Sequence, residues 1–291
     1  MNTKVLILGS GGLGKQVYKD FKNNNFNVFL INRKFIDVEK KFSKLKKFVL
    51  EFRPNYIINC VAKTGTEPCE KSSSEAIKIN SLFPLNLVTL SYKLKIKLIH
   101  FSTDAVFEGK KKGKIYSELD KPFPITIYGQ TKFFGEILIK KYSNVLIIRL
   151  PILFGETQKN QIIDRLISML RSGKKVKVSI DVYSTPLFNK DVSNFLINLI
   201  MKNKFKHIKN KCKKIIHLSS KKYISLFDFI TIIGKIMKNK NLIKKAKERD
   251  FNSKIIKPQY LGLKSNYSKS INKIYKVGLN SKINSYIKSI N

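Results

Sequence analysis

The sequence contains no tryptophan, only three cysteines and no long hydrophobic run. Cys60, Cys69 and Cys212 are too few and too scattered for a disulfide framework or a metal-ligand cluster. We therefore expect a reducing, cytoplasmic setting and no metal site. The apolar runs have the length of strands, well short of the roughly 18–20 residues of a membrane helix. The first run begins at Lys4, which argues against a signal peptide, so we expect no membrane partner.

Acidic side chains are also scarce, with 19 against 58 basic ones, which gives a formal net charge of +39. Such an excess can indicate binding to nucleic acid or to an anionic membrane. Few of the basic residues are arginine, however, the side chain whose bidentate fork suits the reading of bases. The lysines are spread along the whole chain without an aromatic-interleaved patch. We therefore expect no specific nucleic-acid partner, although the charge would help to attract a phosphate-bearing small molecule.

Short apolar runs alternate with helical patterns, most regularly over the first 150 residues. Continuous apolar strands with intervening helices indicate a parallel sheet that is covered on both faces. From these patterns we predict strands at 4–8, 27–31, 56–61, 97–101, 145–150 and 215–218, and helices at 12–22, 39–52, 80–94, 128–142, 160–172, 189–202 and 225–238. The polar, lysine-rich segment 239–291 gives no comparable pattern.

A glycine-rich turn follows the first predicted strand and opens a predicted helix. It has the pattern G-x-G-x-x-G and consists of Gly9, Ser10, Gly11, Gly12, Leu13 and Gly14. The first glycine permits a tight turn, the second lets the backbone approach a pyrophosphate, and the third lets the helix pack against the strand. The helix start adds N–H groups and a partial positive charge. The turn therefore predicts a dinucleotide-binding site made by these six residues.

The second predicted strand is followed closely by Arg33 and Lys34. A site specific for NAD usually has Asp or Glu about 20 residues after the first glycine, where it holds the ribose hydroxyls. Two cations at this place suit a 2′-phosphate instead, so NADPH is the expected cofactor and NADH the alternative. The general richness in lysine explains Lys34 more readily than Arg33.

These features define an α/β fold class, a Rossmann-type doubly wound parallel sheet with a smaller C-terminal substrate-binding part. We expect an NAD(P)-binding Rossmann domain at 1–150. Residues 151–291 would form the smaller part and return some chain to the main sheet. A length of 291 residues with 43% hydrophobic content is sufficient for such a core.

The stretch "YGQTK" places Tyr128 four positions before Lys132 on one face of a predicted helix. A free phenol has a pKa near 10, which is poorly matched to proton transfer at neutral pH. Because a fixed ammonium favours the phenolate, we expect Lys132 to lower the pKa of Tyr128. Gly135 continues the same face and is expected to let the helix backbone approach the sheet.

Polar residues also follow the predicted strand that precedes this helix in the chain. Ser102, Thr103 and Asp104 come directly after it, at the sheet edge where ligands of open α/β sheets bind. Thr103 or Ser102 could donate a hydrogen bond to a substrate carbonyl there. Asp104 could be a second acid, but a turn or cap role is the simpler interpretation.

Several segments resemble the extended short-chain dehydrogenase/reductases, specifically the dTDP-4-dehydrorhamnose reductase family of nucleotide-sugar reductases. They include "INCVA", "LIHFSTDAVFEG", "YGQTKFFGE", "IIRLPILFGE" and "DVYSTP", and the resemblance covers most of the chain. It implies that Thr103, Tyr128 and Lys132 are the catalytic residues. The cofactor contacts it implies include Tyr128 and Lys132 themselves, together with Val61, Ala62, Lys63 and Pro151. The substrate contacts it implies are Ser102, Thr103, Asp104, Ser184 and Thr185.

The chain departs from this family at three places. The glycine turn is one residue shorter than the common G-x-x-G-x-x-G, Ala105 stands where an aromatic residue is typical, and Ile152 where tryptophan is frequent. The last two positions lie toward the sugar, so the resemblance supports the hydride chemistry better than the identity of the sugar.

The resemblance implies NADPH-dependent reduction of the 4-keto group of a nucleotide-linked deoxysugar, in polysaccharide or deoxysugar biosynthesis. A nucleotide sugar would then be the substrate partner, and a homodimer remains open. The alternatives are a non-catalytic subunit like the methionine adenosyltransferase beta subunit, or an epimerase or dehydratase on the same fold.

Overall fold

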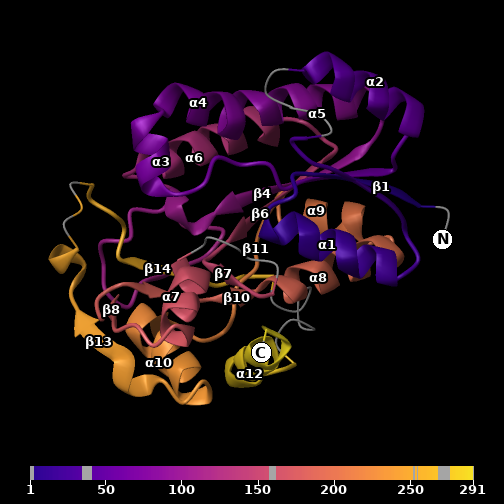
Figure 1. Ribbon diagram of the computed structural model, residues 1–291. Coiled ribbons are helices and arrows are strands. Elements are labelled where there is room, and N and C mark those ends of the chain that lie inside the picture. The colour runs from indigo at the N-terminus through magenta and orange to yellow at the C-terminus, as the bar shows by residue number, and fades with distance from the viewer. Residues whose placement is uncertain are drawn as a thin grey trace.

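A parallel sheet forms the centre of the protein, seen in a computed structural model that describes residues 3–34, 41–156, 162–251, 253, 255–267 and 276–290 (Figure 1). Its strand order is β2-β1-β3-β4-β6-β11, and every neighbouring pair is parallel. The strands are β1 (Lys4–Leu8), β2 (Asn27–Ile31), β3 (Tyr56–Asn59), β4 (Lys97–Thr103), β6 (Val145–Leu150) and β11 (Ile215–His217). The chain order reverses at β1, with β2 on one side and β3 on the other. This reversal leaves a crevice beyond the carboxyl ends of the strands, where ligands of doubly wound sheets bind.

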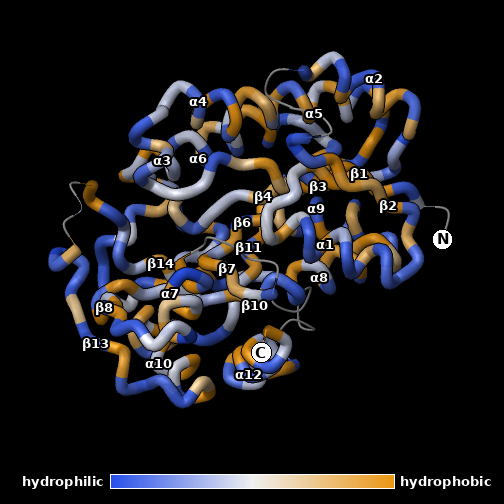
Figure 2. The backbone as a smooth tube through the Cα atoms, viewed as in Figure 1, coloured by the Kyte–Doolittle hydropathy of each residue, from blue (hydrophilic) through white to orange (hydrophobic). Residues whose placement is uncertain are grey.

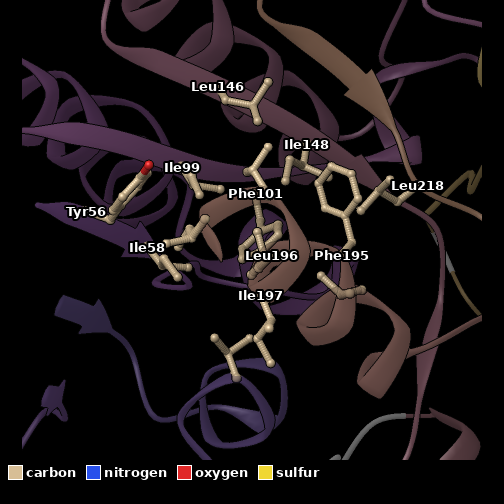
Figure 3. Close-up of a cluster of buried hydrophobic side chains, with 14 of the residues drawn as sticks. Tyr56, Ile58, Ile99, Phe101, Leu146, Ile148, Phe195, Leu196, Ile197 and Leu218 are labelled. Carbon is tan, nitrogen blue, oxygen red and sulfur yellow. The ribbon is translucent and has the colours of Figure 1, made fainter. Parts of the chain in front are cut away.

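Helices cover both faces of this sheet. One face carries α1 (Gly12–Asn23), α8 (Asn189–Met201) and α9 (Phe205–Lys211), and the other carries α2 (Phe42–Phe52), α5 (Phe83–Lys93) and α6 (Ile127–Lys140). Figure 3 shows Ile58, Ile99 and Ile148 of the sheet packed with Phe195 and Leu196 of α8. Because both faces are buried, the strands are largely apolar, with polar residues such as Asn59 and Arg149 near their carboxyl ends, and they appear as mainly hydrophobic segments in Figure 2.

A second, smaller core lies in the C-terminal half. It contains Phe154, whose ring contacts those of Phe229 and Tyr286. The helices around it are α7 (Ile162–Arg171), α10 (Leu226–Ile236) and α12 (Leu279–Ile290). Short strands pair in the orders β12-β9-β14-β5, β10-β7 and β13-β8. They are β5 (Ile115–Tyr116), β7 (Leu153–Phe154), β8 (Val176–Ser179), β9 (Tyr183–Ser184), β10 (Leu187–Phe188), β12 (Ile224–Ser225), β13 (Ile243–Ala246) and β14 (Tyr260–Leu263).

The predicted fold class is confirmed, and the differences concern particular elements. β4 runs through Ser102 and Thr103, so these residues end the strand rather than follow it. The predicted helix at 80–94 begins earlier, as α4 (Ser73–Ile77), a π-helical turn η1 (Lys78–Leu82) and α5. α3 (Thr66–Lys71), α9, β13, β14 and α12 were not predicted. Residues 39, 40, 160 and 161, which begin two predicted helices, lie outside the described residues.

Gly135 does permit a close approach, but its neighbour is η1 and not the sheet. A side-chain carbon at this position would collide with the backbone oxygen of Asn80. The amide of Asn80 also donates to the carbonyl of Lys63 (3.0 Å) and to Oγ1 of Thr131 (3.1 Å). η1 therefore ties the loop after β3 to α6, the helix that carries "YGQTK".

Within the part of the chain that is described, no helix is long and apolar enough to span a membrane.

Candidate active site

A cavity of about 650 Å³ opens beyond the carboxyl ends of the central strands. Its wall is built from the glycine turn after β1, the end of β2, the loops after β3 and β6, the end of β4 and the start of α6. The C-terminal half closes the cavity with residues from β9 and from the segment before β14. One space therefore joins the predicted cofactor turn to the predicted catalytic residues.

The glycine turn has the backbone geometry that a bound pyrophosphate requires. Gly9 has a φ of 94°, and a side-chain carbon there would lie 3.0 Å from the backbone of Cys60. A side chain at Gly14 would collide with the carbonyl oxygen of Gly9, so only glycine lets α1 pack this close. Gly11 faces open space, and α1 begins at Gly12. The turn thus presents bare backbone and a helix start to the cavity, which fits a dinucleotide.

The other predicted cofactor residues divide into two groups. Arg33, Val61, Ala62 and Pro151 line the cavity, as do all six residues of the turn. Lys34 and Lys63 do not belong to the lining, and Lys34 is exposed. Lys63 forms an ion pair with Glu75, which draws its ammonium away. Thr64, Gly65 and Thr66, which directly follow the predicted segment, also line the cavity and were not predicted.

Thr103, Tyr128 and Lys132 all line this cavity, as their spacing predicts. Thr126 caps α6, since its Oγ1 accepts a hydrogen bond from the Gly129 N–H (3.2 Å), and this fixes the turn that carries Tyr128. The hydroxyl of Thr103 lies close enough to the phenol of Tyr128 to influence the pKa of that phenol by hydrogen bonding.

The Thr103 hydroxyl also has a partner in its neighbour along the chain. Thr103 Oγ1 donates to Oδ1 of Asp104 (3.0 Å). Its hydrogen bonding with Tyr128 lowers the pKa of the phenol, which is the effect of a hydroxyl that favours the phenolate. Thr103 therefore lies between the phenol of Tyr128 and the carboxyl of Asp104 at the cavity wall.

The expected lowering of the pKa of Tyr128 was wrong for this structure. Burial raises the pKa of Tyr128 to about 12, the hydrogen bond with Thr103 lowers it in part, and the carboxyl of Asp104 raises it further. The Nζ of Lys132 donates instead to the carbonyl of Phe101 (2.7 Å). The phenol is accordingly neutral at pH 7, which is the form that a general acid needs.

Lys132 itself is almost completely buried, with 2% of its surface exposed. Burial lowers the pKa of its ammonium to about 8, while the charge of Glu136 acts in the opposite direction. Glu136 is held in turn by Arg149, through contacts of 2.9 Å (Nε–Oε1) and 2.6 Å (Nη2–Oε2). This buried ion pair gives Glu136 a structural role behind the site.

Two serine hydroxyls in the cavity wall are available to form hydrogen bonds with a ligand. The Oγ atoms of Ser102 and Ser184 are buried, line the cavity and have no hydrogen-bond partner among the described residues. Thr185, the neighbour of Ser184, lies outside the lining, and its Oγ1 accepts from the Leu263 N–H (3.0 Å). Asp104 lines the cavity and starts a short 3₁₀ turn, with Thr103 as its cap.

Sequence reasoning missed most of the residues that the C-terminal half contributes besides Ser184. Tyr183, Lys257, Pro258 and Leu261 line the cavity, although the last three lie in the segment without a clear pattern. Among the described residues, no group of His, Cys, Asp and Glu side chains could hold a metal ion.

Comparison with known proteins gives matches over the full chain. The family model described as "RmlD substrate binding domain" matches residues 3–291. The spore coat polysaccharide biosynthesis protein SpsK of Bacillus subtilis is 27% identical over 260 residues, covering 89% of this chain and 88% of that protein. A dTDP-4-dehydrorhamnose reductase of Aggregatibacter actinomycetemcomitans is 27% identical over 259 residues, covering 85% of this chain and 86% of that protein.

The structure is likewise similar to that of dTDP-4-dehydrorhamnose reductase from Bacillus anthracis in complex with NADP. The TM-score is 0.86 at 25% identity, over 99% of this chain and 100% of that one. A shorter match joins the chain to the beta subunit of methionine adenosyltransferase 2 from Bos taurus. It has 30% identity over 168 residues, which cover 54% of this chain and 49% of that protein.

Proposed function

Because the chain belongs to the RmlD substrate-binding-domain family, we propose that it is an enzyme that reduces the 4-keto group of a nucleotide-linked deoxysugar with NADPH. The observation that supports this most is the single cavity that joins the glycine turn to Thr103, Tyr128 and Lys132. Relatives named as dTDP-4-dehydrorhamnose reductases match nearly the full chain, one of them in complex with NADP. The reaction would belong to polysaccharide or deoxysugar biosynthesis in the cytoplasm.

The bound cofactor would supply a hydride to the carbonyl carbon. Tyr128 would transfer its phenolic proton to the carbonyl oxygen. The hydroxyls of Ser102 and Thr103 would position that oxygen. Lys132, on the same face of α6, would stabilise the remaining phenolate through its positive charge. A well-placed acid of this kind contributes roughly 10²–10⁴-fold in rate.

The choice of NADPH rests on Arg33, which lines the cavity at the end of β2. A guanidinium there would bind a 2′-phosphate through charge-assisted hydrogen bonds. A dTDP-linked 6-deoxy-4-ketohexose is the leading substrate, followed by UDP- or GDP-linked relatives. The hydroxyl of Ser184, which has no partner among the described residues, offers the sugar a hydrogen bond from the cavity wall.

A non-catalytic regulatory role is the second candidate, and the match to the methionine adenosyltransferase beta subunit favours it. That match covers only about half of either chain, and this chain retains both Tyr128 and Lys132. An epimerase or dehydratase on the same fold is less well supported. A dehydratase would usually carry an acidic pair beside the catalytic threonine, and the "STDAVFE" stretch offers only Asp104 beside Thr103.

The test is NADPH oxidation with a dTDP-linked 4-keto sugar by wild type, Tyr128→Phe and Tyr92→Phe. Tyr92 lies half-exposed on α5 and is the matched control. We expect Tyr128→Phe to lower kcat by roughly 10²–10⁴-fold and to leave NADPH binding intact, because only the proton is lost. Tyr92→Phe should behave as wild type.

Equal rates for wild type and Tyr128→Phe would show that the acid is misassigned. A wild-type protein that binds NADPH and reduces no 4-keto sugar in a broad panel would favour the regulatory role.

A further inference from the structure

A buried row of polar side chains from β3 and β4 reaches Lys132. Asn59 ends β3, His100 lies opposite it on β4, and Lys132 comes from α6. All three are at most 2% exposed. Nδ2 of Asn59 lies 3.0 Å from Nδ1 of His100, and Nε2 of His100 lies 3.4 Å from Nζ of Lys132. Neither Asn59 nor His100 has a part in the proposed reaction.

The hydrogen bonds of Asn59 determine which nitrogen of His100 carries the proton. Oδ1 of Asn59 accepts a hydrogen bond from the Val61 N–H (3.0 Å), which fixes the orientation of the amide. The Nδ2 group that faces His100 can then only donate, so Nδ1 of His100 must accept. A neutral imidazole with an accepting Nδ1 carries its proton on Nε2. Burial and the charge of Lys132 both lower the pKa of His100 well below its ordinary value, which keeps the ring neutral.

The Nε2–H of His100 consequently faces Nζ of Lys132. An ammonium has only donors, so the two N–H groups would oppose each other. A neutral amine has a lone pair and can accept from Nε2–H, while it continues to donate to the carbonyl of Phe101. The imidazole therefore discriminates between the two protonation states of Lys132.

We propose that Asn59 and His100 are positioning residues for Lys132: Asn59 fixes the Nε2–H tautomer of His100, and this N–H favours the neutral amine of Lys132 over the ammonium. The proposal deepens the proposed function, in which Lys132 stabilises the phenolate of Tyr128. It makes the charge of that lysine adjustable near neutral pH instead of permanent.

The other titratable groups near Lys132 do not account for a preference for its neutral amine. Cys60 and Cys69 face it from the segment after β3 and from α3, and burial raises the pKa of these thiols to about 12 and about 11, so both are neutral. Glu136 lies on the same helix but is bound by Arg149, and Tyr128 is neutral. The lowered pKa of Lys132, about 8, agrees with an environment that disfavours its charge.

The tautomer can be observed directly by ¹⁵N NMR of histidine-labelled protein, since the chain has only three histidines. His100→Gln assigns the signal, and His207→Gln at an exposed position of α9 is the control. We expect His100 to be the Nε2–H tautomer at neutral pH, with shifts that follow a titration near pH 8. Lys132→Met should abolish that titration.

An Nδ1–H tautomer, an imidazolium at neutral pH, or a titration that persists in Lys132→Met would each overturn the proposal. The wild-type spectrum alone decides the tautomer, so the result does not depend on whether a variant folds. The measurement also needs no substrate, and its failure is therefore distinct from a failure of the proposed function.

Kinetics supply a second readout if the reduction is observed. Loss of charge on Lys132 should limit kcat/KM at alkaline pH. His100→Gln can turn its amide oxygen toward the ammonium, so the alkaline limb should move upward by about one pH unit. A purely structural role would change the rate at every pH and leave the limb in place, and that result would count against the inference.

Discussion

Asp104 is buried at the end of β4 beside the proposed acid, and burial raises its pKa to about 7 from an ordinary value of 3.8. Hydrogen bonds from Thr103 and the Ala105 backbone oppose this shift only in part. The folded protein therefore binds more protons than the unfolded chain between these two values. The contribution to stability is complete below about pH 4 and is lost as the pH rises through about 7.

Asp104→Asn should remove this dependence, because the amide keeps the shape and has no charge to bury. Between about pH 4 and pH 8, wild type should lose unfolding free energy relative to the variant, by at most about 4 kcal/mol. Urea unfolding of both proteins across this range is the measurement. Parallel curves would show that the carboxyl stays ionised in the folded state.

Arg33 and Lys34 allow a matched test of cofactor choice, since only Arg33 lines the cavity. A charge-assisted hydrogen bond is worth about 1.5–3 kcal/mol. Arg33→Ala should therefore weaken NADPH binding by roughly 10–100-fold relative to NADH, while Lys34→Ala should leave the ratio nearly unchanged. Fluorescence titration with both cofactors measures this. A wild-type preference for NADH would remove the argument for a 2′-phosphate site.

At the scale of single residues, spacing predicted which side chains share a helical face, and their electrostatics depended on contacts that spacing does not encode. The i, i+4 relation placed Tyr128 and Lys132 on one helical face. The hydrogen bond from Lys132 to Phe101 depends on how α6 packs over β4, as does the burial that raises the pKa of Tyr128. The family resemblance implied that Lys63 contacts the cofactor. In the structure its ammonium forms an ion pair with Glu75, twelve positions later.

At the scale of elements, the contact between α6 and η1 holds the catalytic helix in place. Gly135→Ala would improve helix propensity by about 1 kcal/mol. The new carbon would collide with the backbone oxygen of Asn80, which is held by the rest of η1. Because overpacking costs about 1–3 kcal/mol, we expect net destabilisation and reduced activity.

Gly278→Ala is the control for this substitution, since a side-chain carbon there meets nothing within 4 Å. Chemical denaturation and kcat of both variants give the comparison. A Gly135→Ala protein as stable and active as Gly278→Ala would mean that α6 can shift without cost.

The central strands were predictable because burial on both faces makes them continuously apolar. The elements missed lie where composition hides the pattern. β13 and α12 carry lysine, asparagine and serine on their exposed sides, and their buried residues, such as Ile243 and Ile283, belong to the second core. Short strands such as β14 take their place from partners distant in sequence, here β5 and β9, which a local pattern cannot reveal.

At the scale of the whole molecule, the cavity joins distant parts of the chain. Lys257 lines it and forms ion pairs with Glu67 of α3 (3.2 Å) and with Glu248 (3.9 Å). Exposed ion pairs contribute roughly 0–1 kcal/mol, so these contacts orient the segment more than they stabilise it. Of the residues that the second part contributes to the cavity wall, the sequence predicted Ser184 but not Tyr183 or Lys257.

The net charge of +39 is also a property of the whole molecule, and it makes a prediction that separates composition from function. Lysines distributed over the whole chain can neutralise phosphates of any duplex but cannot distinguish base sequences. DNA affinity should therefore be independent of sequence. For about 6–10 phosphate contacts, it should fall by roughly 10³–10⁵-fold between about 50 and 200 mM salt, because binding releases counterions.

Fluorescence anisotropy with several unrelated duplexes at both salt concentrations is the measurement, and saturating NADPH should not alter the salt dependence if the charge is diffuse. A complex with one duplex that persists at physiological salt would instead indicate a surface arranged to read DNA, and the excess of lysine would then be functional.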